Sequence, residues 1–320
     1  MEIAQIKELA DKIRDNVSKV IVGKDEIINL MLTSVLAGGH ILLEDNPGTG
    51  KTMLAKSMAK SIEGDFKRVQ FTPDLMPSDV TGLNVYSQKT GEFSLVKGPV
   101  FTNILLADEI NRGTPRTQSS LLEAMEERQV TIDGETYKLL APFMVIATQN
   151  PIETTGTYPL PEAQLDRFTM KLSMGQSKKD HELDIIGRFI DDKPLESISA
   201  VCKTADIVEA SKGVKNVFVH ECIREYIVNI ILETRENGKS ANGYGSGVST
   251  RGTLSLVRCA QAYAAICGSQ FVEPDHVKAV APWVLGHRIP SVGGKHLKKG
   301  KELISEILSR VEVPVENWEK

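Results

Sequence analysis

The stretch ILLEDNPGTGKT, residues 41–52, begins with an apolar run and continues through a turn that contains two glycines. Gly48 and Gly50 let the backbone turn tightly, so that successive N–H groups can point at phosphate oxygens, and the helical stretch that follows adds its positive N-terminal end. Lys51 is placed to reach the β- and γ-phosphates, and the Thr52 hydroxyl to coordinate Mg²⁺. This order of strand, loop and helix predicts a binding site for a nucleoside triphosphate.

One position departs from the usual form of this motif. The motif ordinarily opens with glycine, and here Asp45 stands at that position. Because the opening glycine has the least chemical role in the motif, the phosphate-loop interpretation is retained. The alternative is an ordinary strand-to-helix turn with a solvated lysine.

Length and composition limit the function classes. A chain of 320 residues is long enough for two or three domains with cores of their own. Its hydrophobic content of 41% and charged content of 25% are those of an ordinary soluble protein. The net charge of −4 gives no general attraction to nucleic acid or to an anionic membrane.

The sequence favours a cytoplasmic protein without a membrane span or a structural metal. No uncharged apolar run approaches the roughly 18–20 residues that a span needs, and residues 1–16 lack the apolar centre of a signal peptide. The four cysteines are scattered without a C-x-x-C pair, which favours reduced thiols in the core. The six histidines show no metal-ligand spacing.

Short, mostly apolar runs alternate with helical stretches before residue 175. The candidate strands are Ile41–Glu44, Lys67–Phe71, Ile104–Ala107, Phe143–Ala147 and Thr169–Leu172. This alternation predicts an α/β fold in which a parallel sheet is covered by helices on both faces. Because ligands in such folds bind beyond the carboxyl ends of the strands, polar residues that follow these strands should share a cleft.

Beyond about Gly175 the sequence predicts helices alone. The expected helices include Glu221–Glu236, Thr250–Ile266 and Pro274–Val284. A basic cluster follows at residues 295–299. Clusters of this kind more often form a solvated surface than a binding site. We therefore expect a nucleotide-binding core over residues 1–176 and a small all-α domain with a basic tail over residues 177–320.

A pair of carboxylates, Asp108 and Glu109, follows the third strand. In a Mg²⁺-dependent ATPase, Asp108 would hold the metal ion and Glu109 would orient and polarise the attacking water. By itself such a pair is as often helix capping, but the phosphate loop upstream favours the catalytic interpretation. Asn150 follows the fourth strand, where its amide either binds that water or belongs to an Asn-Pro turn.

Two arginines are candidates for stabilising charge on the γ-phosphate. Arg167, just before the fifth strand, could act across a subunit boundary or form a surface salt bridge with Asp166. Arg251 lies in the first turn of a predicted helix, where the helix dipole opposes a cation unless a phosphate lies opposite. Arg112 and Arg116 are further candidates for facing a neighbouring subunit.

Two hairpins are predicted where a simple phosphate-loop enzyme would not need them. The first spans about residues 84–96 and turns at residues 89–92. The second joins residues 130–132 to residues 135–137 through Asp133-Gly134, a strong two-residue turn signal. They are either decorations at the sheet edge or elements that hydrolysis moves.

Together these motifs resemble those of the MoxR family of AAA+ ATPases, from about Val20 to Ile289. The specific phrases are VGK at residues 22–24, EDNPGTGKT at 44–52, QFTPDLMPSD at 70–79, DEINR at 108–112, LLEAMEE at 121–127, ATQNP at 147–151, LPEAQLDRF at 160–168 and HRI at 287–289. Asp45 is similar to the acidic residue that many MoxR loops carry, whereas Thr250 stands where relatives usually have proline.

The resemblance implies an AAA+ core with strand order 5-1-4-3-2, a helical lid, a hexameric ring of identical chains, and ATP and Mg²⁺ as cofactors. The implied catalytic residues are Glu109, Asn150, Arg167 and Arg251, and the implied metal ligands are Thr52 and Asp108. The residues implied to bind the nucleotide are Val22, Gly23, Asn46, Pro47, Gly48, Thr49, Gly50, Lys51, Thr52 and Met53. Arg167 becomes the finger that acts in trans and Arg251 the lid sensor, and the hairpins become the helix-2 and pre-sensor-1 inserts that line or flank the pore of a ring.

The function that the resemblance implies is chaperone-like remodelling or maturation of protein clients, often with a partner that carries a von Willebrand factor A domain. The alternatives are a metal-chelatase motor subunit, a nucleic-acid translocase and a monomeric nucleotide switch, which would not need Arg167. Nucleic acid is disfavoured because Lys89 and Lys138 are all that the hairpin tips offer for phosphate contacts.

Overall fold

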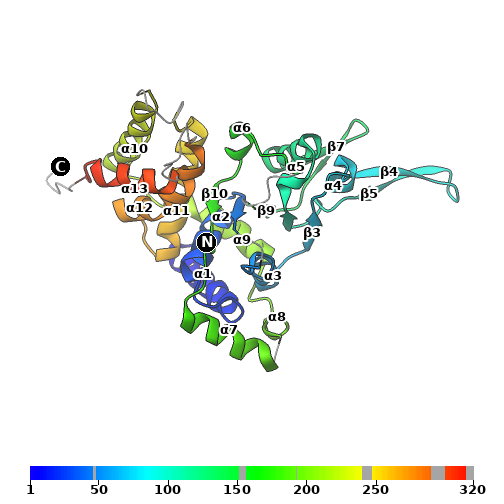
Figure 1. The fold of residues 1–320 in the computed structure, drawn as a ribbon, viewed down its shortest axis with the longest axis horizontal. Helices are drawn as coiled ribbons and strands as arrows, with labels where there is room; N and C mark the ends of the chain where they lie inside the picture. The colour runs from blue at the N-terminus through cyan, green and yellow to red at the C-terminus, as the bar shows by residue number, and fades with distance from the viewer. Residues whose placement is uncertain (46–47, 151–155, 192, 240–246, 290–299, 315–320) are drawn as a thin grey trace.

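A computed structural model of the chain describes residues 1–320 except 46–47, 151–155, 192, 240–246, 290–299 and 315–320. Five strands form one parallel sheet in the order β10-β1-β9-β6-β3 (Figure 1). They are β1 Ile41–Glu44, β3 Phe66–Gln70, β6 Ile104–Asp108, β9 Met144–Gln149 and β10 Met170–Leu172. Counted along the chain this order is 5-1-4-3-2, so the five predicted strands and their order are confirmed.

Alternation of side chains along the strands divides the apolar core into two layers. Leu43 and Leu106 are fully buried in one layer, whereas their neighbours Leu42 and Leu105 are fully buried in the other. The first layer is covered by α1 Ile3–Ser18, α2 Asp25–Leu36 and α3 Lys51–Ser61, and the second by α4 Pro77–Thr81 and α5 Pro115–Glu127. Helices therefore cover both faces of the sheet, as expected.

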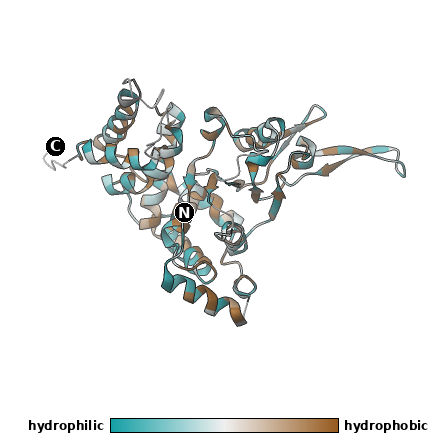
Figure 2. Cartoon of the chain, in the orientation of Figure 1, coloured by the Kyte–Doolittle hydropathy of each residue, from teal (hydrophilic) through white to brown (hydrophobic). Residues whose placement is uncertain are grey.

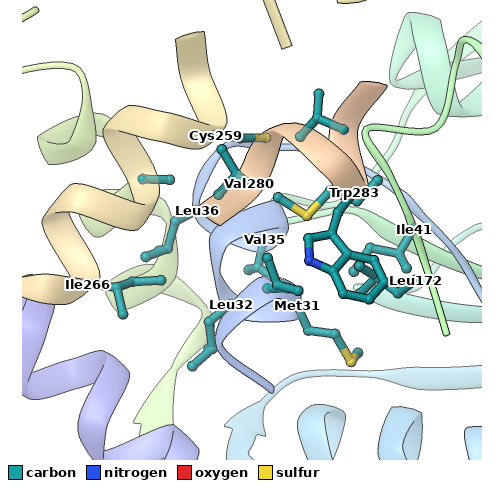
Figure 3. Packing of buried hydrophobic residues seen from close by; sticks show 14 of the residues in the cluster. Met31, Leu32, Val35, Leu36, Ile41, Leu172, Cys259, Ile266, Val280 and Trp283 are labelled. Carbon is teal, nitrogen blue, oxygen red and sulfur yellow. The ribbon is translucent and has the colours of Figure 1, made fainter. Parts of the chain in front are cut away.

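The helical region that follows the sheet packs on the first layer. Its helices are α7 Lys179–Asp191, α8 Pro194–Ser197, α9 Thr204–Val214, α10 Glu221–Lys239, α11 Thr250–Cys267, α12 Pro274–Leu285 and α13 Gly300–Arg310. Figure 3 shows Met31, Leu32 and Val35 of α2 near Ile266 of α11 and Trp283 of α12, all members of one buried cluster. The N-terminal helices thus join the sheet to the lid helices.

One prediction for this region was wrong, because it does not consist of helices alone. A two-residue strand, β11 Cys202–Lys203, pairs in parallel with β2 Ile62–Glu63 at the end of α3. Two residues are too few to carry a recognisable alternation of apolar and polar side chains, so the sequence pattern could not reveal this strand. The basic cluster predicted at residues 295–299 lies outside the described residues.

Both predicted hairpins are present. The first pairs β4 Gly82–Ser87 with β5 Glu92–Lys97, and the second pairs β7 Gln129–Ile132 with β8 Glu135–Lys138. The second hairpin is anchored in the core by Val130 and Ile132, which are buried. The first projects from the body of the molecule (Figures 1 and 2), and Tyr86 and Phe93 on it are 53% and 72% exposed.

All four cysteines are free thiols, but only two belong to the core. Burial raises the pKa of the Cys202 and Cys259 thiols to about 12, so both stay protonated and unreactive at neutral pH. Cys267 is exposed and Cys222 is half-buried. Among the helices described, none combines the length and the apolar character that a membrane crossing requires.

Candidate nucleotide site at the carboxyl edge of the sheet

The phosphate loop connects β1 to α3. Gly48 has a φ of 83° and Gly50 a φ of 88°, backbone conformations that favour glycine. Gly50 directly precedes α3 as its N-cap residue and, as a glycine, makes no side-chain cap to the first N–H groups of that helix. Thr49, Thr52 and Met53 are half-buried beside this turn, whereas Asn46 and Pro47 lie outside the described residues.

Lys51 begins α3, and its side chain reaches back over the loop. Its Nζ donates a hydrogen bond to the backbone oxygen of Asp45 at 2.6 Å. Burial lowers the pKa of Lys51, and the charges of Asp45, Asp108 and Glu109 act in the opposite direction. The loop follows β1 and the carboxylate pair follows β6, and these parallel strands end at the same edge of the sheet, so the pair and the phosphate loop belong to one site.

Thr148, on β9, fixes the carboxylate pair at the end of β6. Its hydroxyl donates to Asp108 Oδ1 at 2.6 Å and accepts from the backbone N–H of Glu109 at 2.8 Å. Glu109 has a φ of 54°, in the left-handed region that residues other than glycine seldom adopt. Strain of this kind is typical of sites where one side chain must be aimed precisely.

The edge strand β3 supplies further contacts to the same pair. Arg68 Nη2 donates to Asp108 Oδ2 at 2.7 Å, and Gln70 Nε2 donates to Glu109 Oε2 at 2.8 Å. Arg112 Nη1 lies 3.1 Å from Glu109 Oε2, so this arginine contacts a carboxylate of its own chain. Sequence reasoning missed the roles of Arg68, Gln70 and Thr148. Arg68 and Gln70 are two residues apart on β3 and so point to the same face of the sheet, next to β6, which ends at Asp108.

Asn150 is the first residue after β9, and its exposed fraction is 6%. The strand β9 lies between β1 and β6 in the sheet. Because these strands are parallel, their carboxyl ends meet at one edge, and Asn150 lies there between the phosphate loop and the Asp108–Glu109 pair.

The donors at this edge fit Mg²⁺. The Thr52 hydroxyl and the Asp108 carboxylate are hard oxygen ligands, which Mg²⁺ prefers. In the part of the chain that the structure describes, no group of three or more His, Cys, Asp or Glu residues is arranged to hold a metal by itself. Mg²⁺ does not need such a group, because it keeps several waters and also binds substrate phosphates.

Arg167 and Arg251 come together on one acidic residue of α5. Arg167 Nε lies 3.1 Å from Glu126 Oε2, and Arg251 Nη2 pairs with Glu126 Oε1. Glu126 therefore offsets the unfavourable position of Arg251 in the first turn of α11, where the helix dipole opposes a cation. Arg116, also on α5, is exposed.

Asp166 does not pair with Arg167; its partner is the buried Arg288 of the lid. Arg288 Nε lies 2.7 Å from Asp166 Oδ1, and Ser249 donates to Asp166 Oδ2 at 3.0 Å. The Arg288 guanidinium also donates to the backbone oxygens of Phe168 and Thr169. Arg288 of the lid thus binds the residue before Arg167 and the two residues after it. The sequence pattern did not reveal this contact.

Val22 and Gly23 lie beside the first turn of α7. Val22 is buried, and Gly23 has a φ of 63°. The His181 ring lies so close to Gly23 that a Cβ there would be 2.2 Å from it, so any other residue would have to displace the ring as well as adopt a φ that favours glycine. His181 was missed by sequence reasoning, because nothing in its local sequence indicates which loop it faces.

The fold and the site define a AAA ATPase, and comparison with known proteins agrees. Residues 40–170 match the model of the ATPase family associated with various cellular activities (AAA), and residues 241–307 match the AAA lid domain. A crystal structure of a Cytophaga hutchinsonii protein superposes with a TM-score of 0.87 at 38% identity, covering 98% of this chain and 97% of that one.

Sequence relatives identify the particular family. The chain is 47% identical to the Bacillus subtilis protein YeaC, over 96% of both chains. It is 41% identical to the chaperone MoxR1 of Mycobacterium tuberculosis, over 85% of this chain and 73% of the relative. It is also 29% identical to the protein MoxR of Methylorubrum extorquens over 88% of both chains. The chain therefore belongs to the MoxR family of AAA+ ATPases.

Proposed function

We propose that this protein hydrolyses ATP with Mg²⁺ at the carboxyl edge of the sheet and uses the cycle to remodel protein clients. Lys51 and the N–H groups of the phosphate loop bind the phosphates, and Thr52 and Asp108 hold the metal ion. Glu109 polarises the attacking water, which Asn150 helps to position. The single observation that carries this proposal is that the phosphate loop follows β1 and the Asp108–Glu109 pair follows β6, two parallel strands on either side of β9 whose carboxyl ends meet at one edge of the sheet.

Bound Mg²⁺ would neutralise charge on the β- and γ-phosphates. Beside the metal position, Thr148 fixes Asp108 and Glu109 relative to each other, and Gln70 donates a hydrogen bond to the carboxylate of Glu109. A carboxylate held by donors on one oxygen retains the other for water. The domain boundary proposed with this function lies at residues 176 and 177, between the nucleotide-binding core and the lid.

Arg167 completes the site of a neighbouring copy rather than its own, and Arg251 is the sensor that the lid contributes. Arg167 precedes β10, and β10 runs parallel to β1 with Met170 opposite Ile41. The phosphate loop begins only after the four residues of β1, roughly 13 Å further along the sheet at 3.3 Å per residue. Arg251 shares Glu126 with Arg167, so the lid sensor and the finger lie side by side. A hexameric ring, as the family resemblance implies, would supply every site with an arginine of this kind from the next copy.

The projecting hairpin of β4 and β5 is the element that ATP hydrolysis would move against a client. Tyr86 and Phe93 lie side by side across its two strands, with ring centroids 5.3 Å apart, and both are exposed. Exposed aromatic side chains suit apolar segments of a polypeptide better than the phosphates of a nucleic acid. A protein client agrees with the chaperone name of the relative MoxR1, and a partner with a von Willebrand factor A domain is the one that the family resemblance implies.

A mixing experiment tests the shared site. Arg167→Ala and Glu109→Gln chains should each be inactive alone, with kcat lowered by about 10³–10⁵ and about 10²–10⁴ respectively. Mixed, they should recover part of the phosphate release, because some interfaces combine an intact Glu109 with an intact Arg167. An Arg14→Ala chain, altered in a surface ion pair with Asp11, is the control and should keep full activity. Absence of any recovery on mixing would favour a monomeric nucleotide switch.

A further inference from the structure

Asp45 is buried, and its carboxylate accepts three hydrogen bonds from the segment that links β10 to α7. Ser173 Oγ donates to Oδ1 at 2.7 Å, the Met174 N–H to Oδ2 at 2.6 Å, and the Gly175 N–H to Oδ1 at 3.3 Å. Gly175 has a φ of 60°. Successive N–H groups that converge on one acceptor form an anion-binding nest. The anion in this nest is a side chain of the phosphate loop.

Two other contacts hold the same segment, residues 173–176, which we call the hinge segment. Lys24 Nζ donates to the backbone oxygens of Met174 at 2.5 Å and Gln176 at 3.2 Å. The Met174 side chain reaches the phosphate loop, since its Cε lies 3.8 Å from where a Cβ on Gly50 would stand. The hinge segment therefore contacts the start of the loop through Asp45 and the end of it through Gly50.

The backbone oxygen of Asp45 faces Lys51, while its side chain faces the hinge segment. Its carbonyl oxygen accepts the hydrogen bond from Lys51 Nζ. A phosphate group attracts the Lys51 ammonium more strongly than a neutral carbonyl does. Binding of a nucleotide therefore changes the partners of the Asp45 peptide group, and the carboxylate on the same residue is tied to Met174 and Gly175.

We infer that Asp45 is a positioning residue that couples phosphate binding at the loop to the hinge segment and, through it, to the lid. This inference rests on the proposed ATP site. Glycine, which ordinarily opens the motif, would leave the donors of Ser173, Met174 and Gly175 without this acceptor. The departure from the usual motif is thus the feature that ties the loop to the segment leading into α7, the first helix after the sheet.

The test combines kinetics with hydrogen exchange on the full-length protein. Asp45→Gly restores the usual opening residue, and Asp45→Asn keeps the size but replaces the charged acceptor by an amide. Both should lower kcat about tenfold or more, as expected for loss of hydrogen bonds to a charged group, and leave KM for ATP within about threefold. In the wild type, exchange of the Met174 and Gly175 amides should slow when ADP or a non-hydrolysable ATP analogue binds. In the variants these amides should exchange faster and no longer respond.

Asp79→Asn is the matched control. Asp79 also accepts a backbone hydrogen bond, from the Met76 N–H at 2.8 Å, but it lies at the start of α4. This variant should leave kcat and the exchange of the hinge segment unchanged. Ser173→Ala removes one of the three donors and should give an intermediate effect on both readouts.

Two results would overturn the inference. The first is wild-type kcat and wild-type exchange of the hinge segment in both Asp45 variants. The second is a loss of nucleotide affinity and thermal stability with kcat and the exchange response intact, which would make Asp45 a purely structural residue. If the wild type itself released no phosphate, the proposed function would fail, and the exchange response to bound nucleotide would still decide the role of Asp45.

Discussion

The carboxyl edge of the sheet and the lid junction around Arg288 both concentrate charged side chains, but they bury them to different degrees. At the edge, Lys51 and Glu109 are half-buried, and their partners can be exchanged for a nucleotide, a metal ion or water. At the junction, the Arg288 side chain is 2% exposed and is surrounded by Asp166 and backbone oxygens. Because of this difference, we expect the charged side chains at the edge to change partners during the ATPase cycle, whereas those at the junction hold the lid against the sheet.

Glu109→Gln should give the largest effect at the edge without affecting stability. Loss of the proposed general base should lower kcat by about 10²–10⁴ while ATP binding is kept. Phosphate release and calorimetric ATP affinity measure the two quantities, and a thermal melt should show an unchanged Tm. Glu123→Gln, on an exposed position of α5, is the control and should be fully active. A Tm that fell with activity would remove the distinction between the two regions.

Lys51→Ala should weaken ATP binding by about 100-fold or more, because the strongest charged hydrogen bonds to the phosphates are lost. The fold should remain intact, since the lysine is only half-buried. Isothermal calorimetry gives the affinity, and Lys56→Ala, exposed on the same helix, is the matched control. Unchanged affinity would show that the cleft lies elsewhere.

Arg288→Ala should have the opposite profile and act on stability first. Removing one partner of a buried ion pair takes the donor from Asp166 Oδ1 and from several backbone oxygens, which costs about 3–5 kcal/mol of unfolding free energy. Chemical denaturation measures this loss. Arg310→Ala, at an exposed i,i+4 pair with Glu306, should change the unfolding free energy by less than about 0.5 kcal/mol. Equal losses in the two variants would contradict the role of the junction.

Buried histidines should make the unfolding free energy depend on pH. Burial lowers the pKa of His40 to about 3 and that of His287 well below its ordinary value. The ring of His40 is neutral, because its Nδ1 accepts a hydrogen bond from the Val145 N–H at 2.9 Å. Above the ordinary histidine pKa near 6.5, neither the folded nor the unfolded state binds the proton, so these histidines do not lower the unfolding free energy. As the pH falls below 6.5 only the unfolded state binds it, and stability is lost at up to about 1.4 kcal/mol per pH unit for each histidine.

Urea denaturation between pH 7.5 and pH 4.5 measures this slope. His40→Gln should reduce the slope of unfolding free energy against pH by up to about 1.4 kcal/mol per pH unit, the contribution of one proton, even if the variant is less stable at every pH. His220→Gln, at an exposed position, should leave the slope unchanged. A slope that stayed the same in His40→Gln would show that His40 is not neutral in the folded state.

The parts of the molecule that were predicted correctly depend on local sequence. The phosphate loop, the five strands and the second hairpin are specified by neighbouring residues, such as Gly48 with Gly50 and Asp133 with Gly134. The family resemblance supplied the strand order, which no local pattern contains. What was missed depends on contacts between distant segments: Thr148 with Asp108, Asp45 with the hinge segment, and Arg288 with Asp166.

The alternative assigned to Arg167 illustrates the same limit. Asp166 is its neighbour in sequence and was the natural salt-bridge partner, yet the two side chains point to different regions. Asp166 binds the lid, and Arg167 reaches Glu126 on α5. Residue types at adjacent positions are known from sequence, but the direction of each side chain is set by packing.

The central claim is that each ATP site is completed by Arg167 of another copy. The most direct measurement is phosphate release per chain as a function of protein concentration, with ATP and Mg²⁺ in excess and the mass of the particle followed by sedimentation. The account predicts that activity per chain rises with concentration, in step with formation of a ring, and is lost on dilution. Activity per chain that stayed constant down to concentrations at which only single chains sediment would contradict it.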